Sequence, residues 1–216
     1  MTAVMPLIGI LALQGDFEAH SKTLERIGTP WRFVKKASDL AGLSGLILPG
    51  GESSTFLKLI QQDEAFFEAI RRFGGSHPVF GTCAGAILLA EKVENPSQPS
   101  LGLLHMTVRR NAYGRQLSSS VQTLELDEEL QRGPEAGTPM EAVLIRAPLI
   151  VDVAPEVRTL ARLHGQPVLV RQGSLLASTF HPELTSDTRV HRYFCQMIPA
   201  GTSDVMEGSS NAGAGG

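Results

Sequence analysis

Apolar runs of strand length alternate with helical patterns through the N-terminal half of this chain. The runs that we interpret as strands cover Leu7–Leu13, Trp31–Val34, Leu46–Leu48 and Pro78–Gly81. Helical patterns lie between and after them, at Phe17–Ile27, at Ser53–Phe73 with a break near Asp63, and at Ala84–Glu91. Such alternation is typical of parallel strands joined by helical crossovers. The sequence therefore predicts a three-layer α/β fold, in which helices flank both faces of a mostly parallel sheet.

Shorter strand patterns, without helices between them, follow in the second half. They cover Leu103–Arg109, Val121–Leu126, Ala142–Ile145, Val157–Leu163 and Val168–Arg171. We interpret them as a small antiparallel extension. Ser174–Phe180 then returns as a core strand, and Asp187–Ile198 is predicted as a closing helix. Residues 1–198 form one predicted domain, and the Gly- and Ser-rich residues 199–216 are expected to be a disordered tail.

Composition limits the partners of the chain. Its 216 residues are 42% hydrophobic and carry a net charge of -3, so nucleic acid and anionic membrane surfaces are not expected partners. The apolar run Leu7–Leu13 is far shorter than the ~18 residues of a membrane span. Only two cysteines occur, Cys83 and Cys195, which are too few for a disulfide framework and typical of a reducing compartment. We therefore expect a cytoplasmic protein whose partners are small molecules or other proteins.

Cys83 stands in the segment V-F-G-T-C-A-G-A, where an apolar strand ends in a glycine-flanked turn and a helix begins. A thiol at such a turn projects from the carboxyl edge of a sheet, and the N-terminus of the following helix favours the thiolate. A lone cysteine is more often a buried packing residue. Gly81 and Gly85 favour a nucleophile instead, because a packing cysteine would need neither glycine.

The segment F-H-P-E at Phe180–Glu183 supplies a base for that nucleophile. If this segment is extended, His181 and Glu183 share one face, so the carboxylate can orient the imidazole and stabilise it once it takes the Cys83 proton. An isolated H-P-E is more often a surface histidine followed by a solvated glutamate. Beside the Cys83 turn, we interpret the three residues as a catalytic triad.

The five other histidines are weaker candidates for the base. His77 lies at the opposite end of the strand that leads to Cys83, six residues away at about 3.3 Å each, and is expected in a loop. His20 and His191 fall in helical patterns near charged residues and are predicted to be surface groups. His105 and His164 lie in the antiparallel part. No pair has the spacing of metal ligands, so no metal site is expected.

Acyl transfer also needs donors for an oxyanion, and P-G-G at Pro49–Gly51 follows a buried strand. We take the backbone N–H groups of Gly51 and Ala84 as candidate donors, although P-G-G alone is an ordinary turn. Arg110 and Arg146 are candidates for binding a substrate carboxylate through the guanidinium group, but a single arginine is more often a solvated surface residue.

Several motifs together resemble one family, the class I (triad) glutamine amidotransferases, and within it the PdxT/SNO family, the glutaminase subunits of pyridoxal 5'-phosphate synthase. The motifs are L-A-L-Q-G-D-F, L-P-G-G-E-S-S-T, G-T-C-A-G, R-N-A-Y-G-R-Q, I-R-A-P and S-T-F-H-P-E-L-T, in that order between Leu7 and Ile198. G-T-C-A-G with H-P-E is shared by triad glutaminases in general, whereas the others indicate the vitamin B6 branch. The resemblance implies a flavodoxin-like fold.

The resemblance also implies an activity. Cys83 would be the nucleophile that forms a γ-glutamyl thioester, His181 the general base and acid, and Glu183 the residue that orients His181. The glutamine site would comprise Gly51, Glu52, Ser53, Arg110, Ile145 and Arg146. L-glutamine would be hydrolysed to L-glutamate and ammonia without a cofactor, and the ammonia would pass to a (β/α)8 synthase subunit that makes pyridoxal 5'-phosphate. The free subunit is expected to be nearly inactive until the synthase docks.

Two other functions are compatible with the residues alone. A stand-alone γ-glutamyl hydrolase or peptidase could use the same triad. A non-catalytic regulatory module could have the same fold, although the intact Cys, His and Glu set argues against it. Cys195, near Phe194 and Met197 at the end of the last predicted helix, is expected to be a packing residue.

Overall fold

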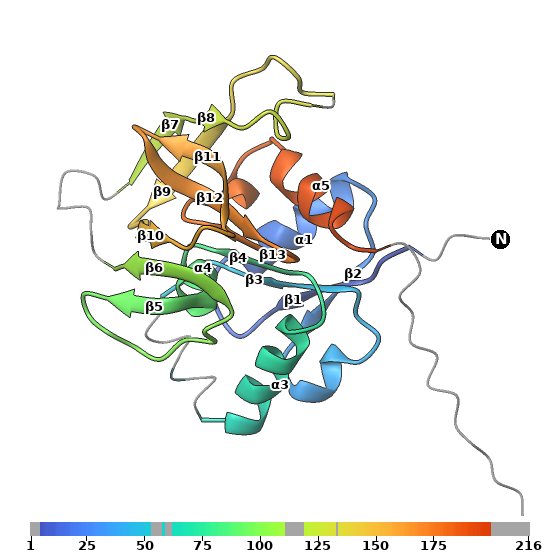
Figure 1. Cartoon of the computed structure of the whole chain (residues 1–216). Helices are drawn as coiled ribbons and strands as arrows, with labels where there is room; N and C mark the ends of the chain where they lie inside the picture. Colours follow the sequence, from blue (N-terminus) through green and yellow to red (C-terminus); the bar gives the residue numbers. More distant parts are fainter. Residues whose placement is uncertain (1–4, 53–57, 59–61, 111–118, 133, 200–216) are drawn as a thin grey trace, which may run out of the picture.

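The computed structural model describes residues 5–52, 58, 62–110, 119–132 and 134–199. Within them the chain forms a central sheet of eight strands in the order β2-β1-β3-β4-β13-β12-β11-β8 (Figure 1). The parallel part comprises the first five strands of that order, β2 (Trp31–Val34), β1 (Ile8–Leu11), β3 (Gly45–Leu48), β4 (Val79–Thr82) and β13 (Leu175–Ser178). The predicted α/β fold class is confirmed.

The antiparallel strands are divided between the central sheet and two smaller sheets. The central sheet continues in antiparallel order through β12 (Gln166–Gln172), β11 (Arg158–Leu163) and β8 (Glu125–Leu126). The small sheets pair β10 (Leu149–Val153), β6 (Leu104–Arg109) and β5 (Ala90–Glu94), and β7 (Ser119–Thr123) with β9 (Glu141–Ile145). The predicted extension is therefore present, but only part of it continues the main sheet, and β5 pairs with β6 in parallel.

Helices cover both faces of the parallel strands (Figure 1). One face is covered by α1 (Phe17–Arg26) and α5 (Arg189–Gln196), and the other by α3 (Glu64–Gly74) and α4 (Ala84–Leu89). Two short 3-10 helices complete the fold, η1 (Ala37–Leu40) and η3 (Pro182–Leu184). Among the described residues, no helix is long and apolar enough to cross a membrane.

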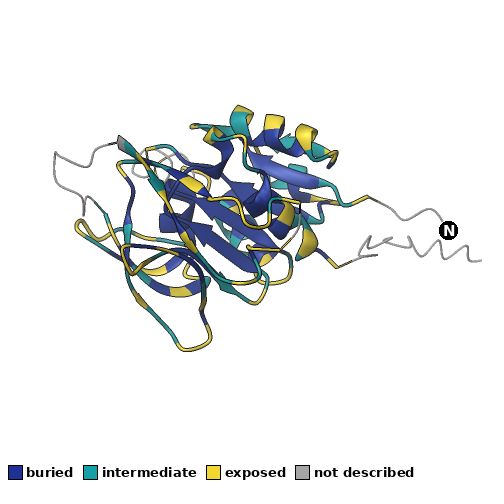
Figure 2. Ribbon diagram, turned by 90° about the horizontal axis from the view of Figure 1, so that it is seen from above, coloured by how far each residue is buried: buried dark blue, intermediate teal, exposed yellow. Residues whose placement is uncertain are grey.

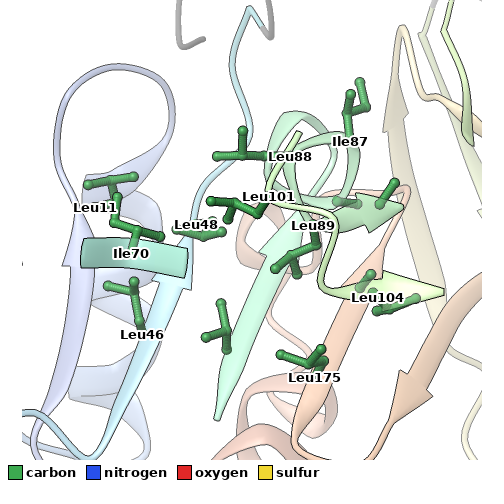
Figure 3. Close-up of a cluster of buried hydrophobic side chains, with 14 of the residues drawn as sticks. Leu11, Leu46, Leu48, Ile70, Ile87, Leu88, Leu89, Leu101, Leu104 and Leu175 are labelled. Atoms are coloured by element: carbon green, nitrogen blue, oxygen red, sulfur yellow. The ribbon is translucent and has the colours of Figure 1, made fainter. Parts of the chain in front are cut away.

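Two hydrophobic cores lie on opposite faces of the sheet, because successive side chains of a strand point to opposite sides. On β3, Leu46 and Leu48 pack in one core with Ile70 of α3 (Figure 3), whereas Ile47 packs in the other core with Leu24 of α1. The parallel strands β1, β3, β4 and β13 are consequently buried on both sides, whereas the edge strand β2 is only partly buried (Figure 2). Continuous apolar runs in the sequence are the expected signature of such strands.

The break predicted near Asp63 is the start of α3. The Asp63 side chain accepts a hydrogen bond from the backbone N–H of Phe66 at 2.9 Å, which is the arrangement of an N-cap. Phe66, Ile70 and Phe73 then form the buried face of the helix. The part of the predicted helix at 53–57 and 59–61 lies outside the described residues, as do residues 200–216 of the predicted tail.

Two expectations about secondary structure were wrong, and one strand was missed. The helix predicted at Ala84–Glu91 ends at Leu89, because Ala90–Glu94 pairs with β6 as strand β5. The strand predicted at Val121–Leu126 is two strands that pair with different partners, since β7 joins β9 and β8 joins β11. Strand β10 was not predicted. In each case pairing with a strand outside the segment decided the structure, and the local pattern does not contain that information.

The turn from β4 into α4 requires its glycines for close packing. A Cβ atom on Gly81 would lie 2.5 Å from the carbonyl oxygen of Gly85, and a Cβ on Gly85 would overlap the carbonyl oxygen of Leu48 in β3. Both neighbours are backbone atoms, which have little room to move. The glycines therefore allow α4 to lie directly against β3 and β4.

We expect Gly85→Ala to lower the free energy of unfolding by about 1–3 kcal/mol, because the added methyl group forces α4 away from β3. Gly75→Ala is the matched control: Gly75 ends α3 with φ of -71°, and its added Cβ would lie 3.4 Å from the nearest atom. The control should be neutral or slightly stabilising. Urea unfolding followed by circular dichroism measures both variants, and equal stability of the two would contradict this account.

Candidate active site

Four loops meet at the carboxyl edge of the parallel sheet, where α/β folds place their ligand sites. They follow the adjacent strands β1, β3, β4 and β13, and they carry Gln14–Asp16, Pro49–Glu52, Cys83 and His181. Because the strands are neighbours and parallel, residues from distant parts of the chain come together at one edge. The structure thus unites the two motifs that the sequence singled out.

Cys83 occupies the turn between β4 and α4, as predicted. Its backbone has φ of 47° and ψ of -101°, a region that residues other than glycine rarely adopt. Such strain costs about 1–3 kcal/mol. Its N–H donates to the carbonyl oxygen of Ser178 in β13 at 2.8 Å, and its thiol lies 4.0 Å from the carbonyl oxygen of Ile145. The neighbouring strand holds the strained turn in place. The next residue, Ala84, starts α4, so its N–H has no intrahelical partner.

His181 and Glu183 form a buried hydrogen-bonded pair. Nδ1 of His181 lies 2.8 Å from Oε1 of Glu183, and the two residues are only 3% and 4% exposed. The expectation of an extended segment was wrong in detail, because Pro182–Leu184 forms the 3-10 helix η3. The carboxylate still reaches the imidazole across Pro182. The His181 N–H donates to the carbonyl oxygen of Val143 at 2.9 Å, which fixes the backbone of the pair against β9.

The environment of His181 favours its protonated form. Burial lowers its pKa, but interaction with Cys83 and with Glu183 outweighs burial and raises the pKa to about 10. Burial raises the pKa of Glu183, opposed by its hydrogen bond to His181. A protonated imidazole between a thiol sulfur and a carboxylate is the charge arrangement of an activated cysteine nucleophile.

A cleft of about 490 Å³ opens above the sulfur of Cys83. Seven residues that the sequence predicted for the site line it, namely Gly51, Glu52, Cys83, Arg110, Ile145, Arg146 and His181. Arg146 lies in the turn between β9 and β10 with a positive φ of 46°, a conformation often found at ligand sites. Ala84 is buried directly behind the cysteine. Ser53 falls outside the described residues.

The Pro49–Gly51 turn packs directly on the triad. A Cβ atom on Gly50 would overlap the His181 ring and would lie 2.9 Å from Nδ1. On its other side, the carbonyl oxygen of Gly50 accepts a hydrogen bond from the Asp16 N–H at 3.4 Å, and the carbonyl oxygen of Glu52 accepts one from Nε2 of Gln14 at 2.8 Å. The loops after β1 and β3 therefore hold each other beside Cys83 and His181.

Gln14, Asp16, Ile87 and Pro148 also line the cleft and were not among the predicted site residues. The Q-G-D turn could have been found, because it follows β1 just as P-G-G follows β3. Asp16 lies with Oδ2 3.6 Å from Nδ1 of His181, and ligand atoms of Asp16, His181 and Glu183 fall within 4.8 Å of one another. Since Nδ1 of His181 is engaged with Glu183, we interpret these two residues as members of the predicted triad, with Asp16 as a neighbouring carboxylate, and not as a metal centre.

The expectation that His20 and His191 lie on the surface was wrong. Both are completely buried, on the faces of α1 and α5 that pack on the sheet, and their rings are hydrogen-bonded at 2.9 Å. His77 lies in a loop, as predicted, and stacks on Phe73. Cys195 packs partly buried against the core of α1 and α5, also as expected.

The remaining two histidines lie away from the triad. His105 is in β6 beside Glu156, and His164 is in the turn between β11 and β12.

The chain is similar to known proteins over nearly all of its length. The model of the SNO glutamine amidotransferase family matches residues 10–200. A pyridoxal 5'-phosphate synthase subunit PdxT from Koribacter versatilis is 54% identical over 91% of this chain and 97% of its own length, and a PdxT from Solibacter usitatus is 48% identical over 90% and 100%. A solved structure of a glutamine amidotransferase shares 46% identity with a TM-score of 0.79, over 88% of this chain and 98% of its own.

The fold, with a cysteine at a strand-to-helix turn and a histidine–glutamate pair beside it, is that of the triad glutamine amidotransferases. Within that class, the chain belongs to the SNO glutamine amidotransferase family. The resemblance inferred from its motifs is confirmed.

We expect Glu183→Gln to lower kcat for glutamine hydrolysis by about 10²–10⁴-fold with little change in KM, because a neutral amide cannot stabilise the His181 imidazolium. Glu156→Gln is the matched control, since Glu156 contacts the exposed His105. The assay is glutamate release in the presence of the synthase subunit. A Glu183 variant that keeps wild-type kcat would contradict the assigned role.

The raised pKa of His181 predicts a pH dependence of stability. Because the folded-state pKa of about 10 exceeds the unfolded value of 6.5, the stabilisation is fully present below about pH 6.5 and is lost as pH rises through about 10. Urea unfolding of the wild type and of His181→Gln, from about pH 6 to about pH 10.5, should show a stability difference that shrinks at high pH. A difference independent of pH would refute the raised pKa.

Proposed function

We propose that this chain is the glutaminase subunit of a pyridoxal 5'-phosphate synthase. It hydrolyses L-glutamine to L-glutamate and ammonia, and it delivers the ammonia to a (β/α)8 synthase subunit. The observation that carries the proposal is the strained Cys83 beside the buried His181–Glu183 pair, in a chain that is 54% identical to a PdxT subunit. The cytosolic location and the domain limits at residues 1–198 stay predictions.

The geometry supports a two-step mechanism. The Cys83 sulfur attacks the γ-carbonyl carbon of glutamine, and His181 gives its proton to the leaving ammonia, which leaves a γ-glutamyl thioester on the sulfur. His181, now neutral, takes a proton from a water molecule that attacks the thioester, and glutamate leaves as the thiolate reforms. Glu183 holds the imidazole through Nδ1 in both steps. All groups come from the chain, and no cofactor takes part.

The lining of the cleft fits an α-amino acid. We assign the backbone N–H groups of Gly51 and Ala84 to the oxyanion of each tetrahedral intermediate. The guanidinium groups of Arg110 and Arg146 have the charge to bind the α-carboxylate, and the Glu52 carboxylate has the charge to bind the α-ammonium group. Gly51, Ser53 and Ile145 complete the proposed glutamine site.

We expect the purified chain alone to release glutamate slowly, and the addition of the synthase subunit to stimulate the release strongly. Cys83→Ala should lower the stimulated rate by about 10³-fold or more, because the thioester cannot form. Cys195→Ala is the matched control, since that thiol lies at the distant end of α5 near Thr29 and should leave the rate unchanged.

Two results would overturn the proposal. Glutamate release by Cys83→Ala at the wild-type rate would remove the nucleophile. Full activity of the chain without any synthase, on glutamine or on γ-glutamyl peptides, would indicate a stand-alone hydrolase instead.

A further inference from the structure

A pair of buried histidines, His20 and His191, lies behind the triad and takes no part in the mechanism described above. Nε2 of His20 lies 3.2 Å from Oγ1 of Thr82 and 3.6 Å from Oε2 of Glu183, and Nδ1 of His20 lies 2.9 Å from Nε2 of His191. All four side chains are buried. These contacts therefore connect α5 through α1 to the triad carboxylate, next to the strand that leads to Cys83.

Glu183 uses only one of its carboxylate oxygens within the described residues. Oε1 is hydrogen-bonded to His181, whereas Oε2 is buried without a hydrogen-bond partner. An unpartnered carboxylate oxygen in a buried position disfavours the ionised form. The nitrogen of His20 at 3.6 Å is the contact of opposite polarity that could relieve this cost, provided that it carries a proton.

Burial keeps both histidines neutral. It holds the pKa of His20 well below its usual value, with smaller contributions from His191 and His181, and it lowers the pKa of His191 to about 3. Each ring therefore carries one proton, and its position on the ring is determined by the neighbouring groups.

One arrangement of these protons satisfies the contacts. If His20 carried its proton on Nδ1, its Nε2 lone pair would face the Glu183 carboxylate, and His191 would keep its proton on Nδ1, where the described residues offer no acceptor. With the proton of His20 on Nε2, the N–H donates to Oγ1 of Thr82 at 3.2 Å and lies 3.6 Å from Oε2 of Glu183, and His191 donates from Nε2 to Nδ1 of His20. Only a lone pair on Nδ1 of His191 is then unpaired, which is less costly than an unpaired buried N–H.

The charged surroundings of Glu183 do not replace this contact. His181 approaches the other oxygen, and the Asp16 carboxylate has the same charge as Glu183 and disfavours its ionisation. An open pocket of about 660 Å³ reaches Glu183 from outside and is lined by Lys22, Arg26 and Glu18 of α1. The positive charge of Arg26 also lowers the pKa of His191.

We propose that His20 is a positioning residue of the triad: its neutral ring directs the Nε2 proton toward Oγ1 of Thr82 and Oε2 of Glu183, and the positive end of this N–H dipole keeps the carboxylate ionised and directed at His181. His191 fixes the ring of His20 in this tautomer. The catalytic part of the inference rests on the proposed glutaminase activity, whereas the proton positions do not.

Nitrogen-15 NMR of histidine-labelled wild-type protein tests the proton positions without any activity. We expect His20 and His191 to be neutral near pH 7, with the proton on Nε2 in both rings. A protonated His20, or a His20 with its proton on Nδ1, would overturn the inference even if the chain proves to be an active glutaminase.

The pH profile of glutamate release, measured in the complex with the synthase subunit, tests the effect on Glu183. We expect His20→Leu to lower kcat near neutral pH about tenfold with unchanged KM, because His20 does not line the cleft. The acid limb of the profile should move up by about one pH unit, since Glu183 becomes easier to protonate.

His20→Gln, which can place an amide N–H where Nε2 lies, should restore most of both effects. His105→Leu is the matched control and should leave the profile unchanged. An unchanged acid limb in His20→Leu, or equal losses in the Leu and Gln variants, would refute the positioning role. If the wild-type complex releases no glutamate, the proposed function fails, and the NMR result still decides the tautomer.

Discussion

The close approach of α4 to β3 is the constraint on which the site depends. The backbone of Gly85 lies against the carbonyl of Leu48, and this contact leaves no room for a side chain. Because the helix begins so near the sheet, the single residue between β4 and α4 must turn sharply, and Cys83 takes a strained conformation to do so. The strain is tolerated because the backbone of β13 accepts a hydrogen bond from Cys83 on one side and α4 packs into the core on the other.

Burial of the triad follows from the same architecture. His181 and Glu183 follow β13 and lie in a space enclosed by α1, β9 and the loop after β3. Water therefore screens their interaction little. In an exposed loop the same pair would contribute little. Here the partners, Cys83 and Glu183, raise the pKa of His181 so far that the imidazole is protonated at neutral pH, while burial raises the pKa of Glu183. His20 of α1 contacts this buried carboxylate, and His191 of α5 contacts His20.

Sequence reasoning succeeded where the information is local. The alternation of strands and helices, the turn at Cys83 and the spacing of His181 and Glu183 are each contained in a few consecutive residues, and the structure brings all of them to one edge of the sheet. It failed where a distant partner decides. His20 has charged neighbours in the sequence, and only the packing of α1 on the sheet shows that its own face is the buried one. Likewise, nothing within Ala84–Glu91 reveals that its last residues pair with β6 as a strand.

The contact between Gly15 and Gly50 limits how the specificity of this cleft can diverge. A Cβ on Gly15 would overlap the carbonyl oxygen of Gly50, and a Cβ on Gly50 would overlap the ring of His181. Neither loop can therefore acquire a side chain at these positions without displacing the other loop or the His181 ring. Relatives with new substrates should keep these two glycines together and differ elsewhere in the cleft.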